Sequence, residues 1–311
     1  MKLSEAIDLY IHRRRAVGAY LHGPETILRS FLHHYGNLDL HRIRTSQIKQ
    51  FLNGRRGVRP STWRGKYGAL KLFFVYWCLR GRLRQSPVPL TVPKPLQDFI
   101  PYIYARAELL RLVKALPQCQ RCSSCLISAG TFRALLLVLY GTGMRLGEAL
   151  GLRVADVDLT QNLIRIRQTK FYKTRLLPIG DDVHRVIENC LLSPNRKNRA
   201  DSPLFQSKTR ERIRPAIAQR TFKRLRKMCG VQRPDTSSFQ PRIHDLRHTF
   251  AVHRVTEWYR QGADVQRLLP ALSTYLEHVS LESTQRYLSM TPELLQQAND
   301  RFQRYVSGGP R

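Results

Sequence analysis

The sequence predicts a mainly α-helical protein with a small β-sheet, an α+β fold divided into two domains. Three observations lead to this prediction. Apolar residues recur at three- and four-residue spacing through most of the chain, one short stretch alternates apolar and polar residues, and four prolines gather between residues 86 and 95. The length of 311 residues, of which 42% are hydrophobic, suffices to bury a substantial core.

The first 88 residues predict a helical bundle. Four segments carry apolar residues at helical spacing: SEAIDLYIHRRR, PETILRSFLHHYG, TSQIKQFLNGRR and STWRGKYGALKLFFVYWCLRGR. The prolines that follow remove backbone donors and favour extended geometry in the residues before them. We therefore expect a bundle over residues 1–88 and a linker over residues 89–105.

Residues 106–311 predict a second domain that is mostly helical. Helices are expected near 106–116 and 131–140, after which the pattern changes. The segment NLIRIRQTKFYKTRLLPIG alternates apolar and polar residues on both sides of a short polar centre. This alternation is typical of a β-hairpin, with strands near 163–168 and 175–179. Helical spacing then returns and continues to the end of the chain.

The balance of charge predicts a polyanion as partner. The chain has 53 Lys and Arg against 22 Asp and Glu, a formal net charge of +31. Basic residues recur on every helix of the predicted bundle, so we expect them to contact this partner, although any one of them alone would be read as a solvated surface charge. These expected contacts are Arg13, Arg14, Arg55, Arg56, Lys66 and Lys71.

Membrane insertion and secretion are not predicted. The chain has no run of about 18 apolar residues that would span a bilayer, and its first residues lack the apolar core of a signal peptide. The six cysteines are too few for a disulfide scaffold in a chain of this length. We therefore expect a cytoplasmic protein without a membrane partner.

Three of the cysteines form a separate candidate site. Cys119, Cys122 and Cys125 are spaced as C-x2-C-x2-C, which suits a structural zinc ion if a fourth ligand comes from elsewhere in the chain. The alternative is a reduced loop whose thiols bind nothing. The sequence leaves both interpretations open.

Two further motifs predict the binding of an anion. In GTGMRLGEALGL, Arg145 follows a turn bounded by glycines, and Glu148 lies one helical turn later, close enough to hold the guanidinium. In HDLRHTF, His244 and Arg247 share a helix face, with His248 beside them. A plain surface ion pair would explain the first motif taken alone. No additional ligand completes a metal site in the second, so an anion is favoured there.

A last motif, YLEHVSLESTQRYLSM, places His278 nine residues ahead of Tyr287. The apolar neighbours of Tyr287 would also allow it to be a core aromatic residue. Transfer of a phosphodiester needs arginines on the nonbridging oxygens, a nucleophile and a proton donor, and a tyrosine hydroxyl can serve as the nucleophile. All these residue types are present in one domain.

Taken together, these motifs resemble those of the tyrosine recombinase (phage integrase) family, in the same order along the chain. The resemblance covers the second domain from about residue 105, which it implies is a catalytic domain, and the bundle is similar in size and position to the core-binding domain of the family. The catalytic residues that the resemblance implies are Tyr287, Arg145, Lys170, His244, Arg247 and His278, supported by Glu148 and His248.

The resemblance also implies a mechanism. Tyr287 would attack a phosphate of double-stranded DNA, form a 3′-phosphotyrosyl link and free a 5′-hydroxyl, which later attacks the link of a partner strand. Because the bond energy is conserved, no ATP, metal or other cofactor is expected. Lys170 occupies the position of the catalytic lysine, but Thr169 and Phe171 stand where the family usually has small residues. Lys173, in the same turn, is the alternative proton donor or a DNA contact.

The function implied is that of a site-specific DNA recombinase or integrase, acting in integration, excision or transposition of a mobile element as a homo-tetramer on two paired DNA sites. The tail after Tyr287 predicts an amphipathic helix that docks either on its own domain or on the next protomer. Two alternatives are a DNA-binding regulator without catalysis, which would have lost catalytic residues, and a type IB topoisomerase-like relaxase. The bundle and the compact length favour recombination.

Overall fold

The structure is a computed structural model and describes residues 1–19, 21–54, 60–90, 100–121, 124–167, 174–193, 196, 198–234 and 239–277, with residues 296, 299 and 303. The chain divides into two compact units, Met1–Phe99 and Ile100–Arg311. This division falls within the segment expected to be a linker. The predicted class, mainly helical with a small sheet, is confirmed.

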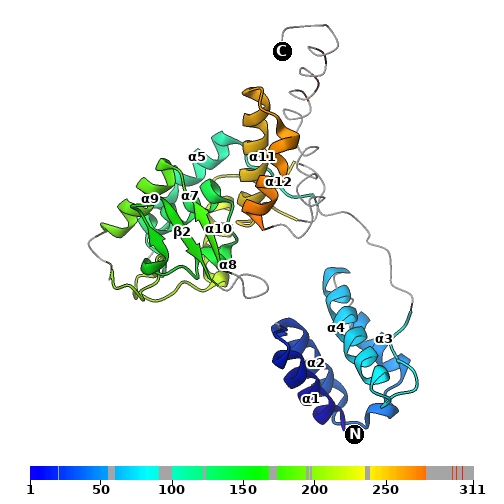
Figure 1. The fold of residues 1–311 in the computed structure, drawn as a ribbon. Helices are drawn as coiled ribbons and strands as arrows, with labels where there is room; N and C mark the ends of the chain where they lie inside the picture. The colour runs from blue at the N-terminus through cyan, green and yellow to red at the C-terminus, as the bar shows by residue number, and fades with distance from the viewer. Residues whose placement is uncertain are drawn as a thin grey trace. The chain divides into compact units, whose positions relative to one another are not determined.

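The N-terminal unit is a helical bundle (Figure 1). Helix α4 packs against the other three helices, because Tyr67, Leu70, Phe73, Phe74 and Trp77 follow one another at three- and four-residue spacing on its buried face. The elements of this unit are α1 (Leu3–Ala16), α2 (His22–Tyr35), the 3-10 turn η1 (Leu40–Arg42), α3 (Thr45–Asn53) and α4 (Pro60–Leu79).

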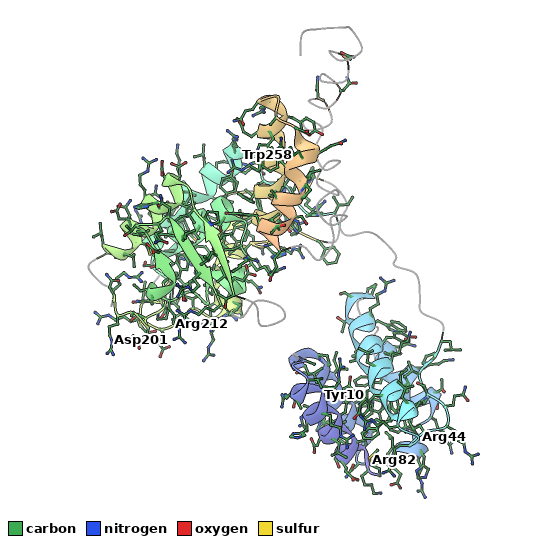
Figure 2. All side chains as sticks on the ribbon, viewed as in Figure 1. Tyr10, Arg44, Arg82, Asp201, Arg212 and Trp258 are labelled. Carbon is green, nitrogen blue, oxygen red and sulfur yellow. The ribbon has the colours of Figure 1, made fainter. Side chains whose placement is uncertain are left out.

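Aromatic side chains fill the core of the bundle. Tyr10 of α1, labelled in Figure 2, lies edge-on against Phe73 of α4 with ring centroids 5.4 Å apart. At the edge of this core, the ammonium of Lys66 donates to the carbonyl of Phe51 over 2.9 Å. Lys66, which we expected to contact the polyanion, therefore also joins α4 to α3.

The second unit combines a small sheet with helices that pack against it and against one another (Figure 1). Its elements are α5 (Arg106–Lys114), α6 (Leu116–Cys119), α7 (Ala129–Thr142), α8 (Leu146–Ala149), the 3-10 turn η2 (Val154–Asp156), β1 (Val157–Asp158), β2 (Leu163–Ile166), β3 (Arg175–Pro178), α9 (Asp181–Leu191), α10 (Pro215–Met228), α11 (Asp245–Arg260) and α12 (Val265–Leu276).

The sheet is antiparallel in the order β1-β2-β3. Ile164 pairs with Leu177, and both side chains are buried together with Ile166, so the period of two places the apolar residues of β2 and β3 on the core face. The hairpin predicted from the alternation is present. The sequence did not indicate β1, because a strand of two residues is too short to show alternation.

Helix α7 is the central helix of the second unit and packs against α9 and α11. It starts two residues before the predicted helix 131–140, since the hydroxyl of Ser128 accepts from the backbone N–H of Thr131 over 3.1 Å and caps the first turn. The predicted helix 106–116 ends at Lys114, and α6 starts a new turn around Pro117. No helix in the described ranges is long and apolar enough to cross a membrane.

Candidate active site

The junction between α7 and α8 positions Arg145. Helix α7 ends at Thr142 and is capped by Gly143, and Arg145 is the residue that precedes α8. Its backbone N–H donates to Oε2 of Glu148 over 2.8 Å, and its Nη1 donates to Oε1 of the same carboxylate over 2.7 Å. The contact expected from their three-residue spacing is therefore present, and it fixes the direction of the guanidinium.

Gly143 makes this junction possible. Its φ is +63°, and a Cβ at this position would lie 2.5 Å from Cδ1 of Phe250 and 2.9 Å from Cδ2 of Leu276. Only glycine combines the left-handed backbone with this close approach. The chain can therefore turn tightly from α7 into Arg145 while α11 and α12 pack against the turn.

Arg247 lies on the first turn of α11 and is 4% exposed. Its Nη1 donates to the carbonyl of Gly143 over 2.8 Å, and its Nη2 donates to the carbonyl of Leu276, the last residue of α12. One buried guanidinium thus ties together the ends of α7 and α12.

His244 immediately precedes α11, and its ring lies edge-on to that of His248 with centroids 5.4 Å apart. His244 is exposed to solvent over part of its surface. The protein atoms packed around the ring remove water, and Arg247 and Arg242 add positive charge, so the pKa of His244 is lowered from 6.5. The ring is therefore mainly neutral at pH 7 in the free protein.

The two arginines converge on one short segment of backbone. Arg145 donates from Nη2 to the carbonyl of Glu277 over 3.2 Å, and Arg247 donates to the carbonyl of the preceding residue, Leu276. The next residue in the chain is His278. Motifs that are about a hundred residues apart in the sequence therefore meet where the last motif begins.

Arg175, the first residue of β3, also belongs to this cluster. Its Nη2 donates to Glu148 over 3.0 Å and its Nη1 donates to Glu277 over 2.8 Å. Burial opposes the charge of Arg145, but its hydrogen bonds to Glu148 and Glu277 and the negative charge of these carboxylates outweigh burial and raise the pKa of Arg145. No sequence pattern had singled out Arg175, although it stands in the hairpin segment TKFYKTRLLPI.

An open cavity of about 700 Å³ adjoins Arg145, and four arginines and two carboxylates line it. Asp156 pairs with Arg167 over 2.5 Å, while Nε of Arg212 donates to the carbonyl of Leu150. Arg212 is labelled in Figure 2. Besides Arg145, the arginines that line the cavity are Arg153, Arg167 and Arg212. They were not predicted, because they are scattered singly in the sequence and only the fold brings them together.

Several predicted site residues lie outside the described residues: Arg55, Arg56, Cys122, Lys170, Lys173, His278 and Tyr287. In the bundle, Arg13 and Arg14 are exposed in the last turn of α1. Lys71 is exposed too, with its ammonium 5.9 Å from the centroid of the Tyr67 ring. Their contacts with DNA stay a prediction.

The described cysteines of the C-x2-C-x2-C segment are bound by an arginine. The guanidinium of Arg224 donates to Sγ of Cys119 over 3.4 Å and to Sγ of Cys125 over 2.8 Å. Within the described part of the chain, no group of three or more His, Cys, Asp or Glu side chains is placed to hold a metal ion. Because Cys122 lies outside that part, the zinc site stays a prediction.

Comparisons with known proteins agree with this arrangement. Residues 106–293 match the phage integrase family. A Sinorhizobium fredii protein described as an integrase/recombinase, y4rB, is 34% identical over 305 residues, which are 96% of each chain. Tyrosine recombinase XerC of Chlorobaculum parvum is 28% identical over 84% of this chain and 79% of its own.

Two solved structures have a similar fold. A lambda integrase dimer bound to a COC′ core site gives a TM-score of 0.66 at 18% identity, over 94% of this chain and 97% of that one. The Tn1549 transposon integrase in complex with a circular intermediate DNA gives a TM-score of 0.66 at 18% identity, over 96% and 99%. The chain therefore belongs to the phage integrase family, and it is an enzyme of the tyrosine recombinase class.

Proposed function

We propose that this chain cuts and rejoins DNA through a 3′-phosphotyrosyl intermediate on Tyr287, in the integration, excision or transposition of a mobile element. One observation carries the proposal: Arg145 and Arg247 bind the carbonyls of adjacent residues at the end of α12. Leu276 and Glu277 belong to the last motif and directly precede His278, so both arginines hold the start of the segment that leads to Tyr287.

Cleavage of a phosphodiester requires positive charge at its nonbridging oxygens, which a pair of arginines supplies. The nonbridging oxygens gain negative charge as phosphorus becomes pentacoordinate, and a guanidinium can bond two of them at once. Arg247 is fixed by two carbonyls and Arg145 by Glu148, so neither has to be reoriented at the moment of reaction. His244 lies beside Arg247 as a mainly neutral imidazole, which can donate one hydrogen bond and accept another.

Tyr275, in the last turn of α12, is a second tyrosine of the same motif and can be compared with Tyr287 as a nucleophile. Tyr275 donates its hydroxyl to the carbonyl of Pro178 over 3.3 Å, and burial raises the pKa of Tyr275 to about 12. A hydroxyl that is already hydrogen-bonded and hard to ionise is a poor nucleophile. We therefore assign the attack to Tyr287, in agreement with the motif.

The leaving 5′-oxygen needs a proton. Lys170 and Lys173 lie in the segment between β2 and β3, and β3 begins with Arg175, whose guanidinium contacts Glu277. This proximity supports a lysine of that segment as the donor, and we propose Lys170, with Lys173 as the alternative. The freed 5′-hydroxyl of one strand then attacks the phosphotyrosyl link of the other, so the reaction needs neither ATP nor a metal.

The proposed partner is double-stranded DNA, and the proposed active assembly is a homo-tetramer on two paired sites. The net charge of +31 suits this partner. A lambda integrase tetramer bound to a Holliday junction, with a TM-score of 0.65 to this chain, provides a precedent for the assembly. A cytoplasmic location stays a prediction.

Trapping of the covalent intermediate tests the proposal. Footprinting on DNA that flanks the gene first identifies the bound site. A duplex of that site, nicked beside the crossover point, should leave an adduct that survives denaturant, because the short 5′-hydroxyl fragment diffuses away. Tyr287→Phe should abolish the adduct while binding of the duplex persists, since only the hydroxyl is removed.

Tyr275→Phe is the matched control and should still form the adduct, because it removes the hydroxyl that burial makes unreactive. An adduct on the Tyr287→Phe variant would refute the assignment of the nucleophile. Binding without any adduct in the unmodified protein would favour the inactive regulator. Relaxation of supercoils without strand exchange between two labelled duplexes would favour the topoisomerase.

A further inference from the structure

One carboxylate oxygen in the active site lies between two guanidiniums. Oε2 of Glu277 accepts from Nη1 of Arg145 over 2.5 Å and from Nη1 of Arg175 over 2.8 Å. Glu148 joins the same two arginines, since its Oε1 accepts from Arg145 over 2.7 Å and its Oε2 accepts from Arg175 over 3.0 Å. The four side chains form one closed cluster of ion pairs.

The position of Oε2 of Glu277 suits an anionic oxygen of a carboxylate or of a phosphate. Guanidinium groups recognise carboxylates and phosphates through the same planar fork of N–H donors. Here two forks supply one donor each to a single oxygen, which is also how two arginines share a nonbridging oxygen of a phosphodiester. In the free protein the carboxylate stands in for that oxygen.

Arg175 contacts both carboxylates with its two Nη groups, and its buried Nε has no hydrogen-bond partner among the described residues. Nε donates from the edge of the guanidinium opposite to Nη1, so it is not part of the exchange. A phosphate that takes the place of Oε2 of Glu277 would accept from Nη1 of Arg175.

Glu277, rather than Glu148, is the carboxylate that can leave. Its side chain is 26% exposed, against 10% for Glu148, and Glu148 is also held by the backbone N–H of Arg145. Glu277 follows α12 with a φ of +55°, which a residue with a Cβ adopts only where contacts compensate for it. The two ion pairs are such contacts in the free protein.

Electrostatics favour a phosphate that replaces the carboxylate of Glu277 over one that binds beside it. Two guanidiniums and two carboxylates neutralise one another, so the charge of a phosphodiester would be repelled by a nearby carboxylate while Glu277 stayed in place. We infer that Glu277 is a resident anion of the phosphate site, that a DNA phosphate binds by displacing it, and that Arg175 then binds this phosphate together with Arg145. The inference rests on the proposed function only in naming DNA as the source of the phosphate.

Inorganic phosphate is a probe that needs no DNA site. Thermal unfolding is followed against phosphate concentration, with ionic strength held constant by sodium chloride. Glu277→Gln keeps the shape of the side chain and removes the competing charge, so the half-saturating phosphate concentration should fall about fivefold or more. Glu277→Gly, which suits the positive φ, is a second variant should the first one fold poorly.

Glu188→Gln is the matched control, because it removes the same charge from an exposed position on α9, away from the cluster. It should bind phosphate like the unmodified chain. Adding Arg175→Lys to the Glu277→Gln variant should remove the increase in phosphate affinity, since an ammonium does not have the planar N–H donors of a guanidinium. In the nicked duplex, Arg175→Lys alone should slow adduct formation at saturating DNA by about tenfold or more.

If the Glu277→Gln, Glu188→Gln and unmodified chains bind phosphate with equal affinity, the inference that phosphate displaces Glu277 is wrong, even if the Tyr287 adduct forms. A gain that survives Arg175→Lys would overturn the role of Arg175. The opposite pattern, with a phosphate gain that depends on Arg175 but no covalent adduct, would leave the exchange standing and refute the proposed function instead.

Discussion

Arg247 is 4% exposed, and its guanidinium donates to two backbone carbonyls from distant segments, those of Gly143 and Leu276. These two hydrogen bonds satisfy buried donors and fix the direction of the guanidinium. A carbonyl carries no net charge, so neither bond cancels the positive charge of the arginine. We expect this charge to act on the phosphate of the DNA.

Arg247→Lys should lower stability as well as cleavage. An ammonium on a flexible stem cannot reach both carbonyls in the geometry of the fork, and one lost hydrogen bond to a charged group costs roughly 1.5–3 kcal/mol. We expect a lower thermal unfolding midpoint, measured by circular dichroism. Arg254→Lys, on an exposed position of the same helix, should stay within about 0.5 kcal/mol. Equal midpoints for the two variants would contradict the structural role of Arg247.

The residues of the site were predictable only where side-chain chemistry repeats at short range. The three-residue spacing of Arg145 and Glu148 indicated their contact, which is present. The burial of Arg247 was not predictable, because its acceptors are carbonyls and no residue type marks a carbonyl. Arg175 was missed for a different reason: its partners, Glu148 and Glu277, lie 27 and 102 residues away and only the fold brings them together.

The turn between α7 and α8 sets the position of Arg145 relative to α11 and α12. Gly143 caps α7 in a left-handed conformation, and its missing Cβ leaves the room that Phe250 and Leu276 fill. Its carbonyl is the acceptor for Arg247. A change in this one turn would therefore move both arginines at once.

Gly143→Ala should destabilise the second unit. The left-handed φ costs about 1–2 kcal/mol for a residue with a Cβ, and the contact at 2.5 Å adds the roughly 1–3 kcal/mol of an overpacked core. Gly130→Ala, within α7 and without neighbouring atoms in reach of a Cβ, should be neutral or stabilise by up to about 1 kcal/mol. Urea unfolding of the two variants measures the difference, and equal midpoints would count against the tight packing at Gly143.

Longer helices and strands were easier to predict from the sequence than short ones. Strands β2 and β3 were indicated because alternation extends over several residues on both sides of the turn. The four-residue helix α8 has too few positions to show a period, and only the Arg145 motif pointed to it. Helix α7 was placed correctly but too short, since the capping serine lies beyond its apolar run.

At the scale of the whole molecule, the described residues form one buried apolar cluster in the N-terminal unit and two in the second unit. Basic residues are present in both units: Arg13 and Arg14 on α1, and Arg153, Arg167 and Arg212 around the cavity beside Arg145. We expect these arginines to contribute to DNA binding, and Arg145 and Arg247 to act on the phosphate. Loss of a distant arginine should weaken binding without changing the reaction at the phosphate.

Arg13→Gln combined with Arg14→Gln tests the bundle as a DNA-binding surface. Each lysine or arginine that neutralises a phosphate contributes about 0.9 to the fall of log K with log salt. The double variant should therefore bind the footprinted duplex with a salt slope shallower by about 2. Arg185→Gln, on α9 and paired with Asp182, should leave the slope unchanged. Fluorescence anisotropy at several salt concentrations measures it, and an unchanged slope in the double variant would remove these arginines from the interface.

The bonds from Arg145 and Arg247 to the carbonyls of Glu277 and Leu276 also bear on how this enzyme can diverge. Every amino acid offers the same carbonyl, so these two hydrogen bonds do not depend on the side chain at position 277, although its φ of +55° favours glycine there. We expect the residue at this position to differ between lineages, most readily by exchange for glycine, without loss of the two hydrogen bonds. Selection can therefore introduce or remove the carboxylate at position 277. Gly143, Arg145 and Arg247 cannot be replaced in this way, because the turn and the two hydrogen bonds need these residues.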